Sequence, residues 1–83
     1  MDYYLILARS VTYAQRMQLA LERAGIRCRV RRAPGDLTDL GCAYVLQVAA
    51  QELPPALAAI HREGLGPARV FLNQRDIYRE VGS

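Results

Sequence analysis

The chain has no lysine and no tryptophan, and it contains only one histidine, one phenylalanine and two cysteines. A single histidine, with no cluster of acids at ligand spacing, does not make a protein-built zinc or iron site, so we expect no metal and no cofactor. Two cysteines without a C-x-x-C pair are too few for a disulfide scaffold, which predicts reduced thiols and a cytoplasmic location. No apolar run approaches the roughly 18 residues of a membrane span, and no signal peptide is recognisable.

The composition is that of one small domain over residues 1–83, with 52% apolar and 23% charged residues. A chain of this length buries only about 60 to 65% of its unfolded surface, so a deep catalytic chamber is not expected, and neither is an enzyme. The basic side consists of eleven arginines against eight acids, for a net charge of +3. That excess is modest, and a nucleic-acid partner is therefore not predicted.

Hydrophobic periodicity predicts six elements, separated by turn residues and helix caps. Ser10 is a candidate N-cap for the first helix and Gly25 follows its end, while Pro54 and Pro55 fit only the first turn of the second helix. The predicted order is a strand at 3–8, a helix at 11–24, strands at 26–32 and 42–48, a helix at 51–63, a strand at 68–72 and a polar C-terminal tail at 73–83.

This order predicts an α+β domain of the ferredoxin-like βαββαβ type, with a four-stranded antiparallel sheet and two helices on one face. The first and third strands would then be central and the second and fourth would be edges. The first and third strands are apolar on both faces, but two helices cover only one. We therefore predict a homodimer that packs the two uncovered sheet faces together.

Cys42 is the candidate functional residue because of where this topology places it. The first strand ends, the first helix begins and the third strand begins at the same edge of the sheet, which predicts that Cys42 lies near Arg9 and Ser10. The positive end of the helix and nearby guanidinium groups would favour a thiolate. Gly41 would leave the sulfur uncrowded. A structural cysteine at a strand start is the alternative.

Cys28 alternates with Ile26 and Val30, which predicts a buried, inert thiol. In the hairpin between the second and third strands it would lie opposite a residue near Leu46, too far from Cys42 for a disulfide.

Four arginines, at positions 27, 29, 31 and 32, form the densest charge cluster. They either bind phosphate or carboxylate groups or protect a solvated edge strand from aggregation. Tyr4 and Tyr44 would be the stacking residues of an RNA-binding sheet, but the aromatic-rich consensus of such sheets is absent.

The ordered motifs of the chain resemble those of the DUF3343 family of selenium/sulfur carrier-like proteins. The resemblance runs from Tyr3 to about Gly66 and rests on Ser10-Val11-Thr12, Ala24-Gly25-Ile26, Ala33-Pro34 followed by Leu37, and Gly41-Cys42-Ala43-Tyr44. Many members of the family have a Cys-Gly pair in this loop, whereas the order here is Gly41-Cys42.

The resemblance implies a carrier in which Cys42 holds sulfur or selenium as a persulfide or selenopersulfide and passes it to a partner. A donor such as a cysteine desulfurase is the implied partner. Arg9, Arg31 or Arg32 would stabilise the anionic chalcogen, Ser10 and Thr12 would cap the adjacent helix, and Pro34 would form a rim. The competing hypothesis is a small dimeric regulatory module with a structural Cys42 and an anion- or protein-binding sheet face.

Overall fold

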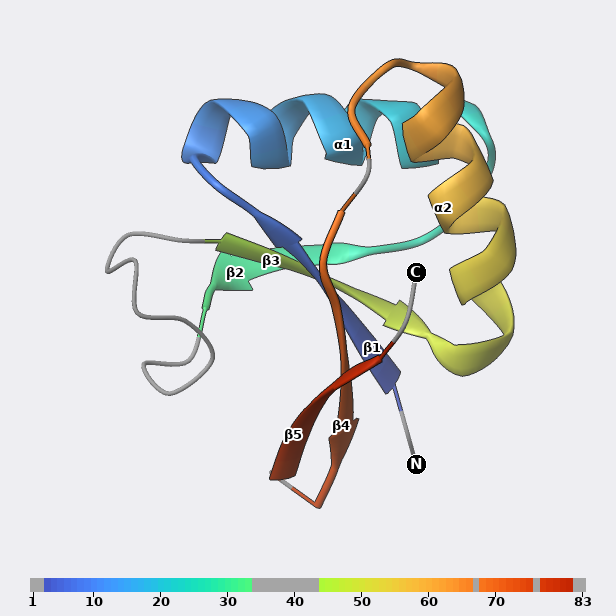
Figure 1. Cartoon of the computed structure of the whole chain (residues 1–83). Coiled ribbons are helices and arrows are strands. Elements are labelled where there is room, and N and C mark those ends of the chain that lie inside the picture. The colour runs from blue at the N-terminus through green and yellow to red at the C-terminus, as the bar shows by residue number, and fades with distance from the viewer. Residues whose placement is uncertain (1–2, 34–43, 67, 76, 82–83) are drawn as a thin grey trace.

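The computed structural model describes residues 3–33, 44–66, 68–75 and 77–81. Within them the chain forms an α+β fold, with two α-helices packed against an antiparallel sheet (Figure 1). The elements are β1 (Tyr3–Ala8), α1 (Val11–Arg23), β2 (Arg29–Arg32), β3 (Tyr44–Ala49), the 3-10 turn η1 (Ala50–Glu52), α2 (Leu53–Arg62), β4 (Val70–Gln74) and β5 (Ile77–Val81).

The described strands form one five-stranded sheet in the order β2-β3-β1-β4-β5, in which every neighbouring pair is antiparallel. The sequence predicted four strands, and that number is wrong. The additional strand, β5, pairs with β4 from Val70↔Val81 to Gln74↔Ile77. As a consequence β4, which was expected at an edge, lies inside the sheet, and the two edges are β2 and β5.

Both helices lie on the same face of the sheet, and their ends follow from local sequence (Figure 1). The Ser10 side chain accepts a hydrogen bond from the Tyr13 N–H at 3.2 Å, which confirms Ser10 as the N-cap of α1. Gly25 ends that helix with φ +76°, a left-handed conformation that glycine adopts without a steric penalty. In α2, proline occupies the first positions, where no intrahelical N–H is required.

The main core, which we call the helix-side core, lies between the helices and this face of the sheet. The large side chains that are fully buried there include Leu21 from α1, Ile60 from α2 and Ile6 and Leu46 from the central strands. Alternate residues of β1 and β3 supply this face, as expected for strands with a side-chain period of two. Tyr4 and Tyr44 also pack against this core, so they do not form a stacking surface on the opposite face.

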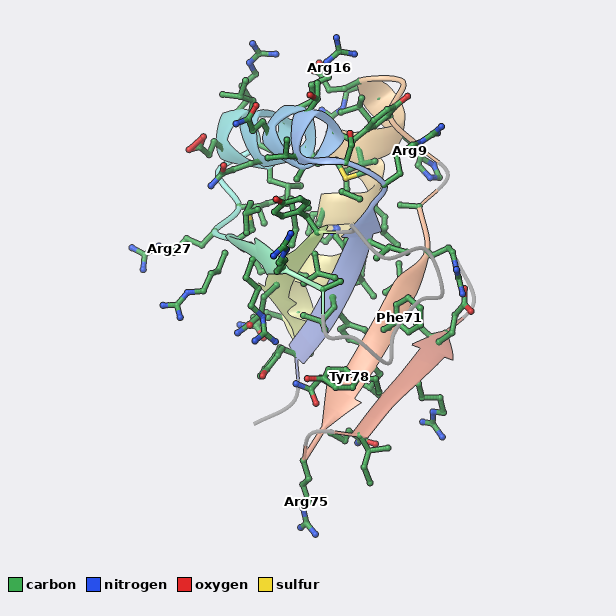
Figure 2. The ribbon with its side chains drawn as sticks, turned by 90° about the vertical axis from the view of Figure 1, so that its left-hand side faces the viewer. Arg9, Arg16, Arg27, Phe71, Arg75 and Tyr78 are labelled. Atoms are coloured by element: carbon green, nitrogen blue, oxygen red, sulfur yellow. The ribbon has the colours of Figure 1, made fainter. Side chains whose placement is uncertain are left out.

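The opposite face of the sheet carries a second cluster, formed by Leu5, Val45 and Phe71, which we call the far-face cluster. Leu5 and Val45 are 0% exposed and Phe71 is 5% exposed within the single chain. Tyr3, Leu7, Ala33 and Tyr78 pack against the cluster, and Figure 2 shows Phe71 on β4 and Tyr78 on β5. The predicted dimer was a means of burying this face, and the structure buries these three residues without one.

β5 is held to the start of β4 by an ion pair as well as by the strand ladder. The Arg69 guanidinium donates two hydrogen bonds to the Glu80 carboxylate, at 2.8 and 2.9 Å. These hydrogen bonds are the main cause of the lowered pKa of Glu80; desolvation acts in the opposite direction, and the positive charge of Arg69 lowers the pKa further. The pair is exposed, so we regard it as a contribution to the register of β5 and not as a major source of stability.

Candidate functional site

The candidate site lies at the end of the sheet where three strand positions form one row. Ala8, the last residue of β1, pairs with Tyr44, the first residue of β3. Tyr44 also pairs with Arg32, the last residue of β2. The end of β1, the start of β3 and the end of β2 therefore meet at one end of the sheet, as the topology predicted. We call Ala8, Tyr44 and Arg32 the site row.

Two residues, Arg9 and Ser10, separate Ala8 of the site row from Val11, the first residue of α1. The first turn of α1 contains no acidic residue, so no carboxylate of that turn neutralises the partial positive charge of the helix end. Ser10 satisfies the Tyr13 N–H, and Thr12 is exposed in the first turn. Because the effect of the helix dipole is confined to the terminal turn, an anion would gain about 0.3 to 1 kcal/mol only when it lies close to this end.

Arg9 follows the site row directly, and its side chain is positioned by an aromatic ring. The guanidinium carbon lies 4.5 Å from the centroid of the Tyr13 ring, a cation–π geometry. Figure 2 shows Arg9 beside α1, on the side of the sheet that carries the helices. Sequence analysis did not identify Tyr13 as the residue that positions Arg9. The four-residue spacing between an arginine and a tyrosine was the available signal.

Arg31 and Arg32 are both exposed, but they lie on opposite faces of the sheet. Val30 packs against the helix-side core, and side chains alternate along a strand, so Arg32 shares the helix face and Arg31 the far face. The pairing of Arg31 with Val45 of the far-face cluster agrees with this assignment. Of the two, Arg32 lies on the face that carries the N-terminus of α1.

Cys42, Gly41 and Pro34 lie outside the described residues. The chain itself limits how far Cys42 can be from the site row, because only Ala43 separates it from Tyr44. Consecutive Cα atoms are about 3.8 Å apart, so two links keep the Cα of Cys42 within about 7.6 Å of the Cα of Tyr44. This limit holds for every conformation of the intervening backbone.

Cys28 lies at the opposite end of β2. The strand begins at Arg29, which pairs with Gln47, so β2 is shorter than the predicted 26–32. Cys28 is four residues from Arg32, about 13 Å along a strand. Its side chain is half-buried against the helix-side core, close to the prediction of a buried thiol.

A shallow surface pocket of about 420 Å³ lies beside Cys28 and is lined also by Gln18, Glu22, Gly25, Ile26 and Arg27. Burial raises the pKa of the Cys28 thiol, and the negative charge of Glu22 raises it further. Both effects favour the protonated thiol, whereas the nucleophile in sulfur chemistry is the thiolate. Cys28 is therefore a poor carrier at neutral pH.

Two further classes of site were searched for within the described residues. No group of three or more His, Cys, Asp and Glu side chains that would hold a metal ion occurs among them. In the same residues, no helix has the length and hydropathy needed to cross a membrane.

Comparison with known protein families gives a match. A family model described as "Putative Se/S carrier protein-like" matches residues 3–72, which include all of the described residues of the candidate site. The match agrees with the resemblance found in the sequence, and it extends that resemblance through most of β4. A comparison with curated proteins found no match.

Proposed function

The chain belongs to this family of Se/S carrier-like proteins, and on that premise we propose that it carries sulfur or selenium on Cys42 in the cytoplasm. The observation that supports the proposal is the register of the site row. It brings the α1 N-terminus, Arg9 and Arg32 to the end of the sheet where the chain enters β3, two residues after Cys42. These are the groups that stabilise an anionic chalcogen.

The chemistry that we propose is a thiol exchange in which one sulfur atom moves without an external oxidant. The Cys42 thiolate attacks the outer sulfur of a donor persulfide, and a new sulfur–sulfur bond forms as that of the donor breaks. The donor leaves as a thiolate, and Cys42 becomes a persulfide. Selenium would move in the same way from a donor selenopersulfide. Attack by an acceptor thiolate on the outer chalcogen then regenerates the Cys42 thiolate.

The described residues favour the anion at both stages of this cycle. Before loading, the positive end of α1 and the Arg32 guanidinium favour the thiolate over the thiol. After loading, the same groups stabilise the terminal S⁻ or Se⁻ of the carried atom. Arg9 contributes from a restricted position, because the Tyr13 ring holds its guanidinium.

We propose a carrier and not an enzyme, since one thiol holds one atom and returns to its starting state only when a partner accepts the load. A donor protein such as a cysteine desulfurase is the partner class implied by this chemistry. We do not include a homodimer through the far face of the sheet, because Leu5, Val45 and Phe71 are buried within one chain.

The test is to incubate the reduced protein with a sulfane-sulfur donor and to measure its intact mass. We expect the wild type to gain about 32 Da, the mass of one sulfur atom, as a persulfide. Cys42→Ser should not gain it, and Cys28→Ser, the matched control, should gain it as the wild type does. Mild reduction should remove the added mass.

Two results would contradict the proposal. An adduct that persists in Cys42→Ser would place the sulfur on another residue. A wild type that gains no mass from a donor that loads a free thiol peptide in the same buffer would leave Cys42 as a structural residue at the start of a strand.

A further inference from the structure

The edge strand β2 has an excess of charge of one sign. Arg27, Arg29, Arg31 and Arg32 are all exposed. The sequence contains no acidic residue between Glu22 and Asp36, and no ion pair joins these four arginines to a described carboxylate. We call these four residues the arginine edge. Figure 2 shows Arg27 extending away from the body of the protein.

The backbone of β2 is available for pairing on one side. In the described sheet, β2 pairs with β3 and has no strand on its other side. Every second residue of an edge strand directs its N–H and C=O away from the sheet, where they can bind an added strand. The β2 part of the arginine edge therefore combines main-chain groups that pair with no described strand with positive charges, and Arg29 and Arg31 are spaced as alternate residues of the strand.

The other edge of the sheet, β5, does not have such a charge excess. β5 carries one exposed arginine, Arg79, and one exposed glutamate, Glu80, and Glu80 is paired with Arg69. Charged side chains on an edge strand discourage edge-to-edge pairing, and the general rule does not require them to share one sign. Of the two edge strands, only β2 carries charge of a single sign. This charge favours a partner of opposite sign.

We propose that the arginine edge binds an extended acidic segment of a partner protein, which adds to the sheet as a sixth strand beside β2. Main-chain hydrogen bonds would supply the pairing, and carboxylates at alternate positions of the segment would meet the guanidiniums of Arg29 and Arg31, which lie on the same face. Two residues along a strand span about 6.6 Å, and this spacing sets the repeat of the acids.

A protein segment fits this edge better than a nucleic acid does. Single-stranded nucleic acids bind through aromatic side chains on which bases stack. On the far face, Phe71 is buried, and Tyr3 and Tyr78 are half-buried against the far-face cluster. Tyr4 and Tyr44 belong to the helix-side core. The arginine edge itself contains no aromatic residue, so it offers charge and main-chain groups but no stacking platform.

This inference goes beyond the carrier function and does not depend on it. Arg32 belongs both to the arginine edge and to the site row, so a partner segment bound on β2 would end beside the point where the chain enters β3, two residues after Cys42 in the sequence. Binding is measured in the Cys42→Ser protein as well as in the wild type. Loss of sulfur transfer and loss of docking are then observed separately.

The experiment measures binding by fluorescence anisotropy at low ionic strength. The probe is a labelled peptide of about eight residues, the length of a strand, with glutamate alternating with valine. Three comparison probes are used. They are the same peptide with glutamine for glutamate, an equally acidic peptide with alternating prolines that cannot pair as a strand, and a single-stranded RNA of equal charge.

The variants separate the arginine edge from general charge. Arg29→Glu combined with Arg31→Glu should weaken binding of the Glu-Val peptide by roughly tenfold or more, because two attractive contacts become repulsive. Arg16→Glu combined with Arg79→Glu changes the net charge by the same amount on α1 and on the other sheet edge, and should change binding less than about threefold. Arg29→Gln combined with Arg31→Gln removes the two positive charges without adding negative ones, and should give an intermediate loss of affinity for the Glu-Val peptide.

Thermal melting must first show that each variant is folded, and the glutamine pair replaces the glutamate pair if the latter is not. Equal losses in the β2 and control variants would overturn the proposal, because binding would then follow net charge alone. Equal affinity for the proline-containing peptide would exclude strand addition. Tighter binding of the RNA, with the same dependence on Arg29 and Arg31, would assign the arginine edge to nucleic acid instead.

Discussion

Replacement of Leu5 by alanine tests whether the far face of the sheet is part of the core of a single chain. Leu5 is 0% exposed and lies in the far-face cluster with Val45 and Phe71. Truncation of a fully buried leucine to alanine costs the transfer free energy of the lost carbons and a further amount for the cavity, together about 2 to 5 kcal/mol. Half-buried neighbours such as Tyr3 and Tyr78 can move into part of the space, so we expect about 3 kcal/mol.

That loss is large for a domain of this size. A chain of 83 residues has a free energy of unfolding of about 4 to 12 kcal/mol. In a domain of this length each kcal/mol corresponds to about 4 to 8 °C in Tm, so Leu5→Ala should lower Tm by about 12 to 24 °C. The measurement is urea unfolding followed by circular dichroism, with thermal melts as a second readout.

Two control variants calibrate the result. Leu46→Ala removes a fully buried leucine from the helix-side core and should be destabilising to a similar degree. Leu19→Ala removes a leucine that is 52% exposed on α1, and should change the stability by less than about 0.5 kcal/mol. All four proteins are measured at two concentrations about a hundredfold apart, because the unfolding midpoint of a dimer depends on concentration.

The reasoning fails if Leu5→Ala behaves like Leu19→Ala, since the far-face cluster would then add little to the core. It also fails if the wild-type midpoint rises with protein concentration and the rise is lost in Leu5→Ala. That pattern would mean that a second copy completes the burial of this face.

Two further predictions concern the helix cap and the half-buried thiol of Cys28. Ser10→Ala removes the hydrogen bond from the Tyr13 N–H and should lower the free energy of unfolding, measured by heat or urea, by about 1 kcal/mol. Ser10→Asp, which keeps a capping oxygen, should retain most of the stability. Equal stability of Ser10→Ala and the wild type would contradict the capping role. The pKa of Cys28 is raised in the folded chain, so between the pKa of the unfolded thiol, about 8.5, and the higher pKa of the folded thiol only the unfolded chain has lost the proton. Stability therefore falls as pH rises through this window. Urea midpoints of Cys42→Ser should therefore fall more steeply between about pH 8 and pH 10 than those of Cys28→Ala/Cys42→Ser, and parallel slopes would refute the assignment.

Local patterns in the sequence were sufficient to predict β1 and α1. The bounds of β1 agree with the prediction, and α1 ends one residue before the predicted end, since Ala24 is its C-cap. These elements are defined within one stretch of chain by an N-cap, a closing glycine and an apolar period. Ala24, the last residue of the predicted helix, is exposed because it lies in the capping turn.

β5 could not be predicted in the same way. Its residues alternate weakly in polarity, and none of the five is fully buried, so the strand has little hydrophobic signal of its own. The chain reverses at Arg75, which has φ 51° in place of the Asn-Gly or Asp-Gly that usually marks such a hairpin. β5 forms because β4 offers a ladder, and the exposed Arg69–Glu80 pair contributes to its register; neither interaction can be read from the pattern of the β5 residues alone.

The site row was predictable for a different reason, which is that antiparallel topology fixes which strand ends meet. The register then decided a point that the topology left open, namely that Arg31 and Arg32 lie on opposite faces. The alternation of Val30 with the arginines contained this information, but it became usable only once Val30 was known to pack under the helices. The positions of Cys42 and Gly41 lie outside the described residues and stay predictions.

The two proposals together constrain how a carrier of this kind would work. A carrier must be recognised by a donor and by an acceptor, and a strand edge pairs through main-chain groups that every extended segment possesses. A donor and an acceptor that both present acidic segments would therefore use the same arginine edge. Because only one segment can pair with β2 at a time, the donor must leave before the acceptor binds.

Arg32 lies at the junction of the two surfaces, so occupation of the arginine edge would also change the charge beside the carried atom. Transfer and recognition would in this way be coupled through one guanidinium.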